Sequence, residues 1–193
     1  MFPSPHPLAP RVERLLADFA RKDKPTVADF AALRCFGKLY DALDRYRAKA
    51  QEMSVPELRG EKHRSRRLGL NLARCGDPRP SPRCDAHAIV SGQHSASIQA
   101  RGVLAWLKLR IDDPHNGCWL PRDWEDRWHM PPYLRNGVPH RRIHHEGYYG
   151  WLNQMIHPLL IKTPEQLIQA LRMIRTMLQE GNVPPSVMPQ TGR

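Results

Sequence analysis

Histidines are concentrated in the central part of the chain, and their spacing suggests a metal site. Eight of them lie between positions 87 and 157: His87, His94, His115, His129, His140, His144, His145 and His157. His140 and His144 are four residues apart in PHRRIHHEGYYGWL, which we predict to be helical from about Pro139 onward. Residues at this spacing share one helical face, so both imidazoles could reach one metal ion. A single histidine is more often structural, and an isolated pair is a weak signal, so a third ligand is needed.

The segment CDAHAIVSG offers that third ligand. Apolar and β-branched residues surround His87 and predict a short strand over Ala86–Val90. Asn116-Gly117 is a turn signal, and Cys118–Leu120 is predicted to form a second short strand. The order strand, turn, strand and helix predicts a ββα unit with a metal bound among its histidines.

The segments on either side predict a mostly helical α+β chain. Residues 11–21 and 26–53 have apolar side chains at helical spacing. We divide the chain into an N-terminal helical region (1–58), a basic, proline-rich linker (59–83), the domain that carries the histidines (84–180) and a flexible tail (181–193). The linker is interpreted either as a solvated connection or as an arm that contacts nucleic acid.

The clearest helix boundaries lie near the C-terminus. Thr163 is expected to cap a helix that has Pro164 in its first position. Gln166 completes a capping box with Thr163, and Gly181 is expected to end the helix.

The charge of the chain limits the classes of partner. Lys and Arg number 30 against 19 Asp and Glu, for a formal net charge of +11. This excess favours polyanions, with nucleic acid first and an anionic membrane surface second, although it could also serve solubility alone. No stretch has the roughly 18 apolar residues of a membrane span, and MFPSPHPLAP does not have the pattern of a secretory signal.

Four ordered blocks of the sequence resemble the AHH family, toxin nucleases of the HNH/endonuclease VII (ββα-metal) superfamily. The blocks are A-H-x-I-V (Ala86–Val90), A-x-x-x-A-R (Ala96–Arg101), N-G-x-x-L-P (Asn116–Pro121) and H-x-x-x-H-x-x-x-Y-Y (His140–Tyr149). The resemblance covers about residues 84–160 and leaves the first 80 residues uncovered. It implies a ββα-metal nuclease core behind an N-terminal helical region.

The resemblance also implies roles for individual residues. His87, His140 and His144 match the metal ligands of the family. Three neutral imidazoles suit Zn²⁺ best, with Ni²⁺ or Mg²⁺ as alternatives. Asn116 matches a residue that organises the loop orienting the catalytic base. Arg101 matches a recurrent arginine that contacts phosphate, but it could equally form a structural ion pair.

The chain departs from the family pattern at Ala88, where a second histidine is expected to act as general base. Alanine cannot accept a proton, so we expect severely impaired activity. Three explanations compete: an engineered replacement of a native histidine, which we favour; a natural pseudonuclease that still binds metal and nucleic acid; or a substitute base such as His94, His115 or His145.

The function that follows from the resemblance and the charge is a metal-dependent, largely non-specific DNA endonuclease. Such a protein would act as an antibacterial toxin or secreted effector, exported without a signal peptide and active in the cytoplasm of the target cell. A cognate immunity protein, acidic to complement the positive charge, is implied as a partner, and a secretion carrier or adaptor is a further candidate. The alternatives are a non-catalytic, zinc-containing nucleic-acid-binding module and an RNase of the same fold.

Overall fold

The computed structural model describes residues 11–189. Residues 1–10 of the predicted N-terminal region and 190–193 of the predicted tail lie outside the described residues. The chain divides into two compact units, Met1–Glu52 and Met53–Arg193, which we describe separately.

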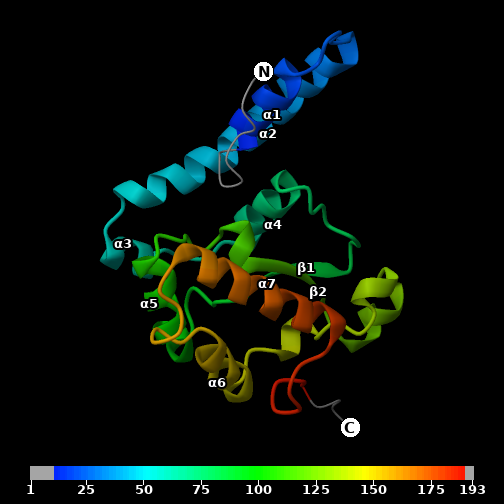
Figure 1. The fold of residues 1–193 in the computed structure, drawn as a ribbon. Helices are drawn as coiled ribbons and strands as arrows, with labels where there is room; N and C mark the ends of the chain where they lie inside the picture. The colour runs from blue at the N-terminus through cyan, green and yellow to red at the C-terminus, as the bar shows by residue number, and fades with distance from the viewer. Residues whose placement is uncertain (1–10, 190–193) are drawn as a thin grey trace. The chain divides into compact units, whose positions relative to one another are not determined.

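The first unit is a pair of packed helices, α1 (Arg11–Ala20) and α2 (Val27–Glu52) (Figure 1). Their bounds agree with the predicted helices to within one residue. The rings of Phe19 and Phe30 meet edge to face across the pair, with centroids 4.9 Å apart. This contact is apolar and lies within the unit.

The second unit is built around a two-stranded antiparallel hairpin of β1 (Cys84–Ala88) and β2 (Gly117–Pro121). In its register His87 lies opposite Cys118, and Ala88 lies opposite Gly117. The remaining elements are α3 (Val55–Gly60), α4 (Ser65–Arg74), η1 (Ser95–Ser97), α5 (Ile98–Trp106), η2 (Pro114–Asn116), η3 (Trp124–His129), η4 (Pro132–Leu134), η5 (His140–Arg142), α6 (Glu146–Met155) and α7 (Pro164–Glu180). The predicted class, mostly helical α+β, is confirmed.

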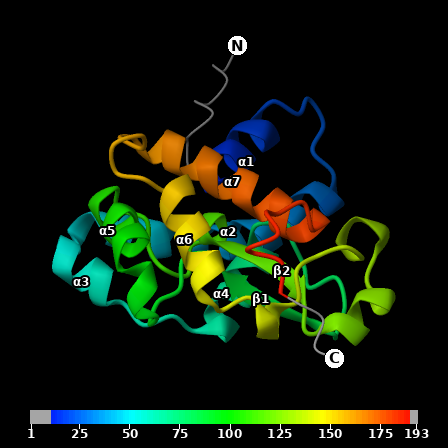
Figure 2. The ribbon, with the colours of Figure 1, turned by 90° about the horizontal axis from the view of Figure 1, so that it is seen from below.

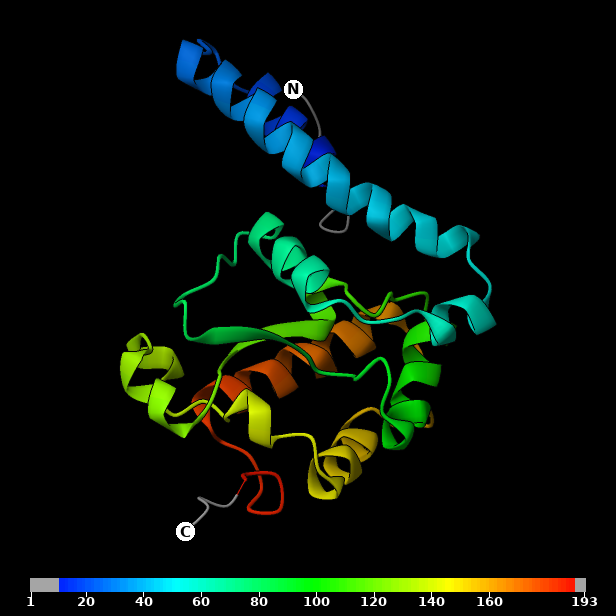
Figure 3. The ribbon, with the colours of Figure 1, turned by 180° about the vertical axis from the view of Figure 1, so that it is seen from behind.

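The two faces of the hairpin contact different parts of this unit. Side chains alternate between the faces of a strand, so Ala86 and Ala88 share one face, where they pack with Leu68 and Leu72 of α4. On the other face, Leu120 joins the main core formed with α5, α6 and α7. Figures 1 and 3 show α4 on one side of the hairpin and α7 on the other. Figure 2, seen from below, shows α6 in front of the hairpin.

The segment 59–83, predicted to be a linker, instead contains the whole of α4. Leu68 and Leu72 are fully buried, four residues apart on the face toward the hairpin. The arginines of this segment, such as Arg67 and Arg74, flank these leucines on both sides, and they obscured the apolar stripe in the sequence. The segment is therefore part of the compact unit.

Charged groups fix the start of α4 against the loop before β2. Asp112 accepts hydrogen bonds from the backbone N–H of Arg64 at 3.1 Å and from Nε of Arg67 at 2.5 Å. Glu61 forms ion pairs with Arg67 and with Arg110. The carboxyl group of Asp112 is fully buried, and a buried charge of this kind is stable only with such partners.

Helix α7 has the predicted boundaries. The Thr163 hydroxyl accepts from the backbone N–H of Gln166, and the Gln166 side chain accepts from that of Thr163, which completes the capping box. Gly181 follows the helix with a φ of 72°, a conformation that glycine adopts without strain.

The segment after α7 differs from the predicted flexible tail as far as residue 189. Val187 is fully buried, and Nε2 of His145 donates to its carbonyl oxygen at 3.1 Å. A Cβ atom on Gly147 would lie 2.0 Å from the carbonyl oxygen of Ser186, so glycine permits this close approach. Within residues 11–189, none of the helices combines the length and hydrophobicity that a transmembrane span requires.

Candidate metal centre

The structure brings His87, His140 and His144 together. Their ring centroids are 5.3 Å, 5.4 Å and 5.5 Å apart in the three pairs, and one donor atom from each lies within 4.8 Å of the others. His87 comes from β1 and is buried, His140 from η5 is half-buried, and His144 is the most exposed of the three. The cluster is therefore buried at His87 and accessible to solvent at His144.

The prediction that His140 and His144 share one helical face is wrong. His140 belongs to the short 3₁₀ turn η5, and α6 begins only at Glu146. Ile143 lies between the two elements and is fully buried. Because Ile143 turns into the core here, a bent connection rather than a continuous helix places both imidazoles beside His87.

A chain of hydrogen bonds determines which nitrogen of His87 is free. The hydroxyl of Tyr148 donates to the carbonyl oxygen of Ile89 at 2.6 Å. It must then accept the proton of His87 Nε2, which lies 3.0 Å away. This leaves Nδ1 of His87 unprotonated, and that buried atom has no hydrogen-bond partner in the described part of the chain. An orphaned buried lone pair is costly unless a ligand such as a metal ion occupies it.

The other two histidines are oriented in the same manner. Nδ1 of His140 donates to Asp85 Oδ2 at 3.3 Å, and Nδ1 of His144 lies 2.9 Å from the Tyr149 hydroxyl. In both rings Nε2 is left as the candidate donor to a metal. Partners of this kind fix the tautomer and the direction of a ligating imidazole.

The environment keeps all three imidazoles neutral, which is the form that ligates a metal. Burial, followed by the nearby His140 and His144, holds the pKa of His87 well below 6.5. Partial burial of the His144 ring, with His140 as the next cause, lowers its pKa to about 4. Burial also lowers the pKa of His140, although the hydrogen bond to Asp85 acts in the opposite direction.

These observations fit a divalent metal ion held by His87, His140 and His144. Three nitrogen donors suit zinc or another late first-row ion, and a three-residue set leaves a coordination position open for water or substrate. When bound, such an ion would polarise a phosphodiester and stabilise charge on the leaving oxygen.

The cluster opens into a pocket of about 250 Å³. The pocket is lined by His63, Ser65, His87, Ala88, Ser91, Gly92, Gln93, His140 and His144. The position of the expected catalytic base, Ala88, is thus in the wall of the same pocket as the candidate ligands.

Asn116 fixes the chain directly after β1. Its side-chain oxygen accepts from the backbone N–H of Val90 at 2.8 Å. Its amide donates to the carbonyl oxygens of Val90 at 3.2 Å and Ile111 at 2.8 Å. Its own carbonyl accepts from the N–H of Ile89. These bonds hold the residues that follow position 88 and do not involve a candidate metal ligand.

Arg101 contacts a residue that lines the pocket and is not itself a lining residue. Its Nη1 donates to the carbonyl oxygen of Gly92 at 2.6 Å, and Gly92 lines the pocket. Its Nε is buried without a hydrogen-bond partner among the described residues. The geometry therefore assigns Arg101 a contact that fixes this loop.

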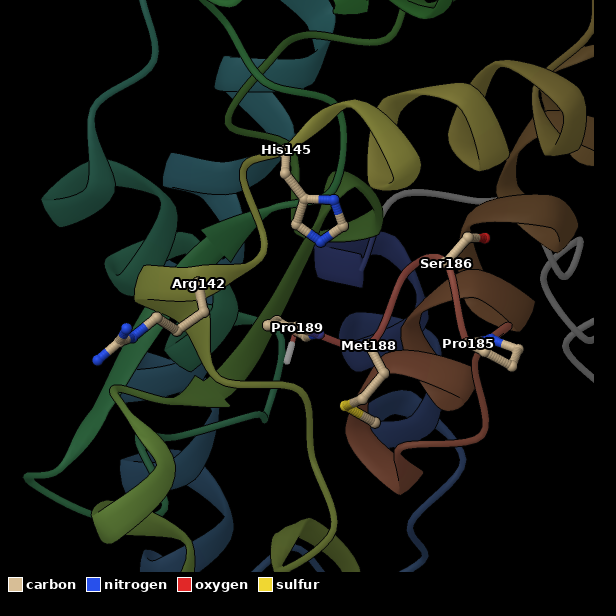
Figure 4. Close-up of a pocket in the computed structure, with 6 residues that line it drawn as sticks. All are labelled: Arg142, His145, Pro185, Ser186, Met188 and Pro189. Atoms are coloured by element: carbon tan, nitrogen blue, oxygen red, sulfur yellow. The ribbon is translucent and has the colours of Figure 1, made fainter. Parts of the chain in front are cut away.

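The three histidines considered as substitute bases lie elsewhere. Among the described residues that line the pocket, none is His94, His115 or His145. Nδ1 of His94 accepts from the N–H of Ala96, and its ring stacks on Tyr149 with centroids 4.1 Å apart. Figure 4 shows that His145 lines a different pocket, of about 410 Å³, beside the segment 185–189.

Asp85, Tyr148 and Tyr149 are site residues that the sequence reasoning missed. Both tyrosines entered the sequence analysis only as the end of the block His140–Tyr149, with no role of their own, yet their hydroxyls orient His87 and His144. Asp85 is two residues before His87 and therefore on the same face of β1, so the period of the strand could have revealed it. The tyrosines had no such local signal, because their role depends on the bend at Ile143.

Comparisons with known proteins agree with this geometry. Residues 68–176, more than half of the chain, match the model of AHH, described as a nuclease family of the HNH/ENDO VII superfamily with conserved AHH. Searches of curated proteins and of solved structures returned no match. The matched range includes both strands, the three clustered histidines and Asn116. The chain therefore belongs to the AHH family of HNH/ENDO VII nucleases.

Proposed function

We propose that the protein is a metal-dependent endonuclease that cleaves DNA with little sequence preference. The observation that supports it most directly is the free, buried Nδ1 of His87 beside the two other histidines. Nucleases of the HNH type use divalent metals, and this cluster supplies three nitrogen donors for one. Zn²⁺ is the ion that we expect, because the donor set is imidazole only.

The surface near the cluster supports a nucleic-acid substrate. Arg79 and Arg122 lie 3.7 Å and 3.6 Å from Asp85, the carboxylate that contacts His140. Arg142 follows His140 in η5 and is half exposed. Arginines that contact phosphate oxygens position a duplex without reading its sequence, so they favour loose binding of a polyanion.

We further propose that the protein acts as an antibacterial toxin or secreted effector. A nuclease with little sequence preference would damage the cell that makes it, so an inhibitor is required, and an acidic immunity protein would complement the net charge of +11. Delivery by a signal-peptide-independent machine, with a carrier or adaptor, and action in the cytoplasm of the target cell belong to this proposal.

The first test is metal binding followed by cleavage. The purified chain, stripped of metal, should bind one equivalent of Zn²⁺ or Ni²⁺ by calorimetry and then cleave supercoiled plasmid. Total RNA in a parallel reaction separates a DNase from an RNase. Tight plasmid binding without cleavage, both by this chain and by Ala88→His, would establish the non-catalytic zinc module instead.

Ala88 makes the level of activity a separate question. If the base of the family at this position is indispensable, the chain should bind metal but cleave far more slowly than Ala88→His. A general base contributes about 10²- to 10⁴-fold to such reactions. That comparison separates an inactivated nuclease from one that obtains its base elsewhere.

A further inference from the structure

We propose that His63, oriented by Asp112, is the general base that position 88 does not supply. This inference rests on the proposed nuclease function and names a further residue of the same site. His63 lies in the segment predicted to be a linker, and it lines the pocket that contains the three candidate ligands and Ala88.

Asp112 determines which nitrogen of His63 carries a proton. Nδ1 of His63 lies 2.5 Å from Asp112 Oδ1, and this carboxylate is fully buried. A carboxylate can only accept here, so Nδ1 carries a proton, and in the neutral form of the ring Nε2 has the free lone pair. A base held by an acidic partner through its other nitrogen is the arrangement used in activating nucleophiles.

Nε2 of His63 is on the open side of this pair. His63 has an exposed fraction of 22 %, whereas its partner Asp112 has 0 %. Nε2 lies 3.2 Å from the hydroxyl of Ser65, an exposed residue that lines the same pocket. Its hydroxyl can rotate away, which lets a water molecule take its place at Nε2.

The fold places His63 on the side of the hairpin toward which Ala88 points. Ala88 packs in the cluster with Leu68 of α4, and His63 lies two residues before Ser65, the first residue of that helix. Gly117, opposite Ala88 in the hairpin, has Leu68 so close that a Cβ atom would lie 2.6 Å from its Cδ1. A small residue at 88 and a glycine at 117 therefore allow α4, and with it His63, to approach the strand end.

Gly92 closes the other side of His63. A Cβ atom on Gly92 would lie 2.7 Å from Cβ of His63 and 2.9 Å from its backbone nitrogen. The carbonyl of this glycine accepts from Arg101, which holds the loop in place. His63 is thus fixed by Asp112 on one side and by the loop of Gly92 on the other.

The chemistry assigned to His63 is the transfer of one proton. The oxygen of a water molecule forms a bond to the phosphorus, and the proton lost from that water moves to His63 Nε2. The P–O bond to the leaving sugar oxygen breaks, and that oxygen takes up a proton from solvent. The charge gained by His63 is stabilised by Asp112, which keeps its hydrogen bond to Nδ1 throughout.

The test compares cleavage rates of the metal-loaded full chain under single-turnover conditions. His63→Gln can still contact Asp112 but cannot accept a proton, so its rate should fall about 10²- to 10⁴-fold, with unchanged Zn²⁺ affinity. His129→Gln, the same substitution at an exposed histidine of η3, should retain the parental rate. Adding Ala88→His to His63→Gln should raise the rate again.

Two results would overturn the role of His63, and a third concerns the proposed function itself. A His63→Gln protein that cleaves at the parental rate excludes His63 as the base. A parental chain that is inactive while Ala88→His cleaves shows that position 88 was indispensable. If neither the parental chain nor Ala88→His cleaves plasmid or RNA, the nuclease function fails, and the role of His63 falls with it.

Two further readouts separate a base from a structural residue. Added imidazole should restore part of the rate of His63→Ala, while the His129→Gln protein reports any inhibition that imidazole causes by binding metal. Long-range ¹⁵N NMR of the metal-free chain should show the neutral His63 ring with its proton on Nδ1. A ring that carries its proton on Nε2, or the absence of rescue in a folded His63→Ala protein, would exclude the proposed role.

Discussion

The candidate site has two halves, which lie on the two faces of β1 at His87 and Ala88. The sequence predicted the residues on the face of His87 but not those on the face of Ala88. The face of His87 meets His140 and His144, which sequence spacing had already grouped. The face of Ala88 meets α4 and the segment of His63, which had been interpreted as a linker. Residues that bind one metal ion are of the same type, so they can be recognised together in the sequence. A single residue such as His63 has no such pattern around it.

The two faces should also respond differently to substitution. On the metal face, the hydroxyls of Tyr148 and Tyr149 and the carboxylate of Asp85 orient the histidines. Changes there should alter metal affinity first. On the α4 face, changes should alter the rate at saturating metal and leave the affinity unchanged.

The largest effect is expected from His87→Ala. It removes the buried donor of the cluster, so Zn²⁺ affinity should fall by more than about 100-fold, since even partners of a ligand contribute 10- to 100-fold. Cleavage should be lost with it. Calorimetry and plasmid cleavage measure the two quantities, and His129→Ala serves as the exposed control. Stoichiometric, tight metal binding by His87→Ala would contradict the assignment of His87 as a metal ligand.

The next effect is expected from Tyr148→Phe. The ring stays in the core, but His87 Nε2 loses its acceptor and the Ile89 carbonyl loses its donor. Zn²⁺ affinity should fall about 10- to 100-fold, while the rate at saturating Zn²⁺ stays near the parental value. Tyr149→Phe should cost less affinity, because its partner His144 is the most exposed ligand and water can replace the hydroxyl. Equal affinities for the parental and Tyr148→Phe proteins would contradict the role of this hydroxyl.

A smaller effect is expected from Gly92→Ala on the α4 face. The new methyl group would displace the backbone of His63, so the rate at saturating metal should fall about tenfold. Metal affinity should not change. Gly102→Ala is the matched control, because a Cβ atom there has nothing within 4 Å. A loss of Zn²⁺ affinity in Gly92→Ala without a loss of rate would reverse the assignment of the two faces.

Particular residues show how far sequence reasoning reached. The hairpin strands, the caps of α7 and the grouping of His87 with His140 and His144 followed from local patterns. The bend at Ile143 did not, because a buried side chain in the tertiary core overrides the local helical spacing.

The α4 face was missed for a different reason. His63 and Asp112 are 49 residues apart, and their contact depends on the ion pairs that fix α4. No periodicity or motif joins two residues at such a separation. The loss of the expected histidine at 88 was visible in the sequence, but the side chain that lies in the same pocket was not.

The smallest effect is expected from pH on the stability of the metal-free protein. The pKa of His144 is lowered to about 4, and that of His87 is well below 6.5. Between pH 6.5 and about 5 the unfolded chain therefore binds protons at these positions that the folded chain does not. By linkage the free energy of unfolding falls as the pH falls through this range. Above pH 6.5 the imidazoles are neutral in both states, so they cause no such loss of stability.

Thermal melts of the metal-free chain should show Tm decreasing by a few degrees between pH 7 and pH 5. Asp123 does not titrate in this window, because its pKa, lowered first by its hydrogen bond from the N–H of Trp124, lies below it. His144→Gln keeps a side chain that can contact Tyr149 but removes one titrating group, so its Tm should vary less with pH. If the Tm of His144→Gln varied with pH as much as that of the parental chain, the lowered pKa of His144 would not be the cause of the dependence.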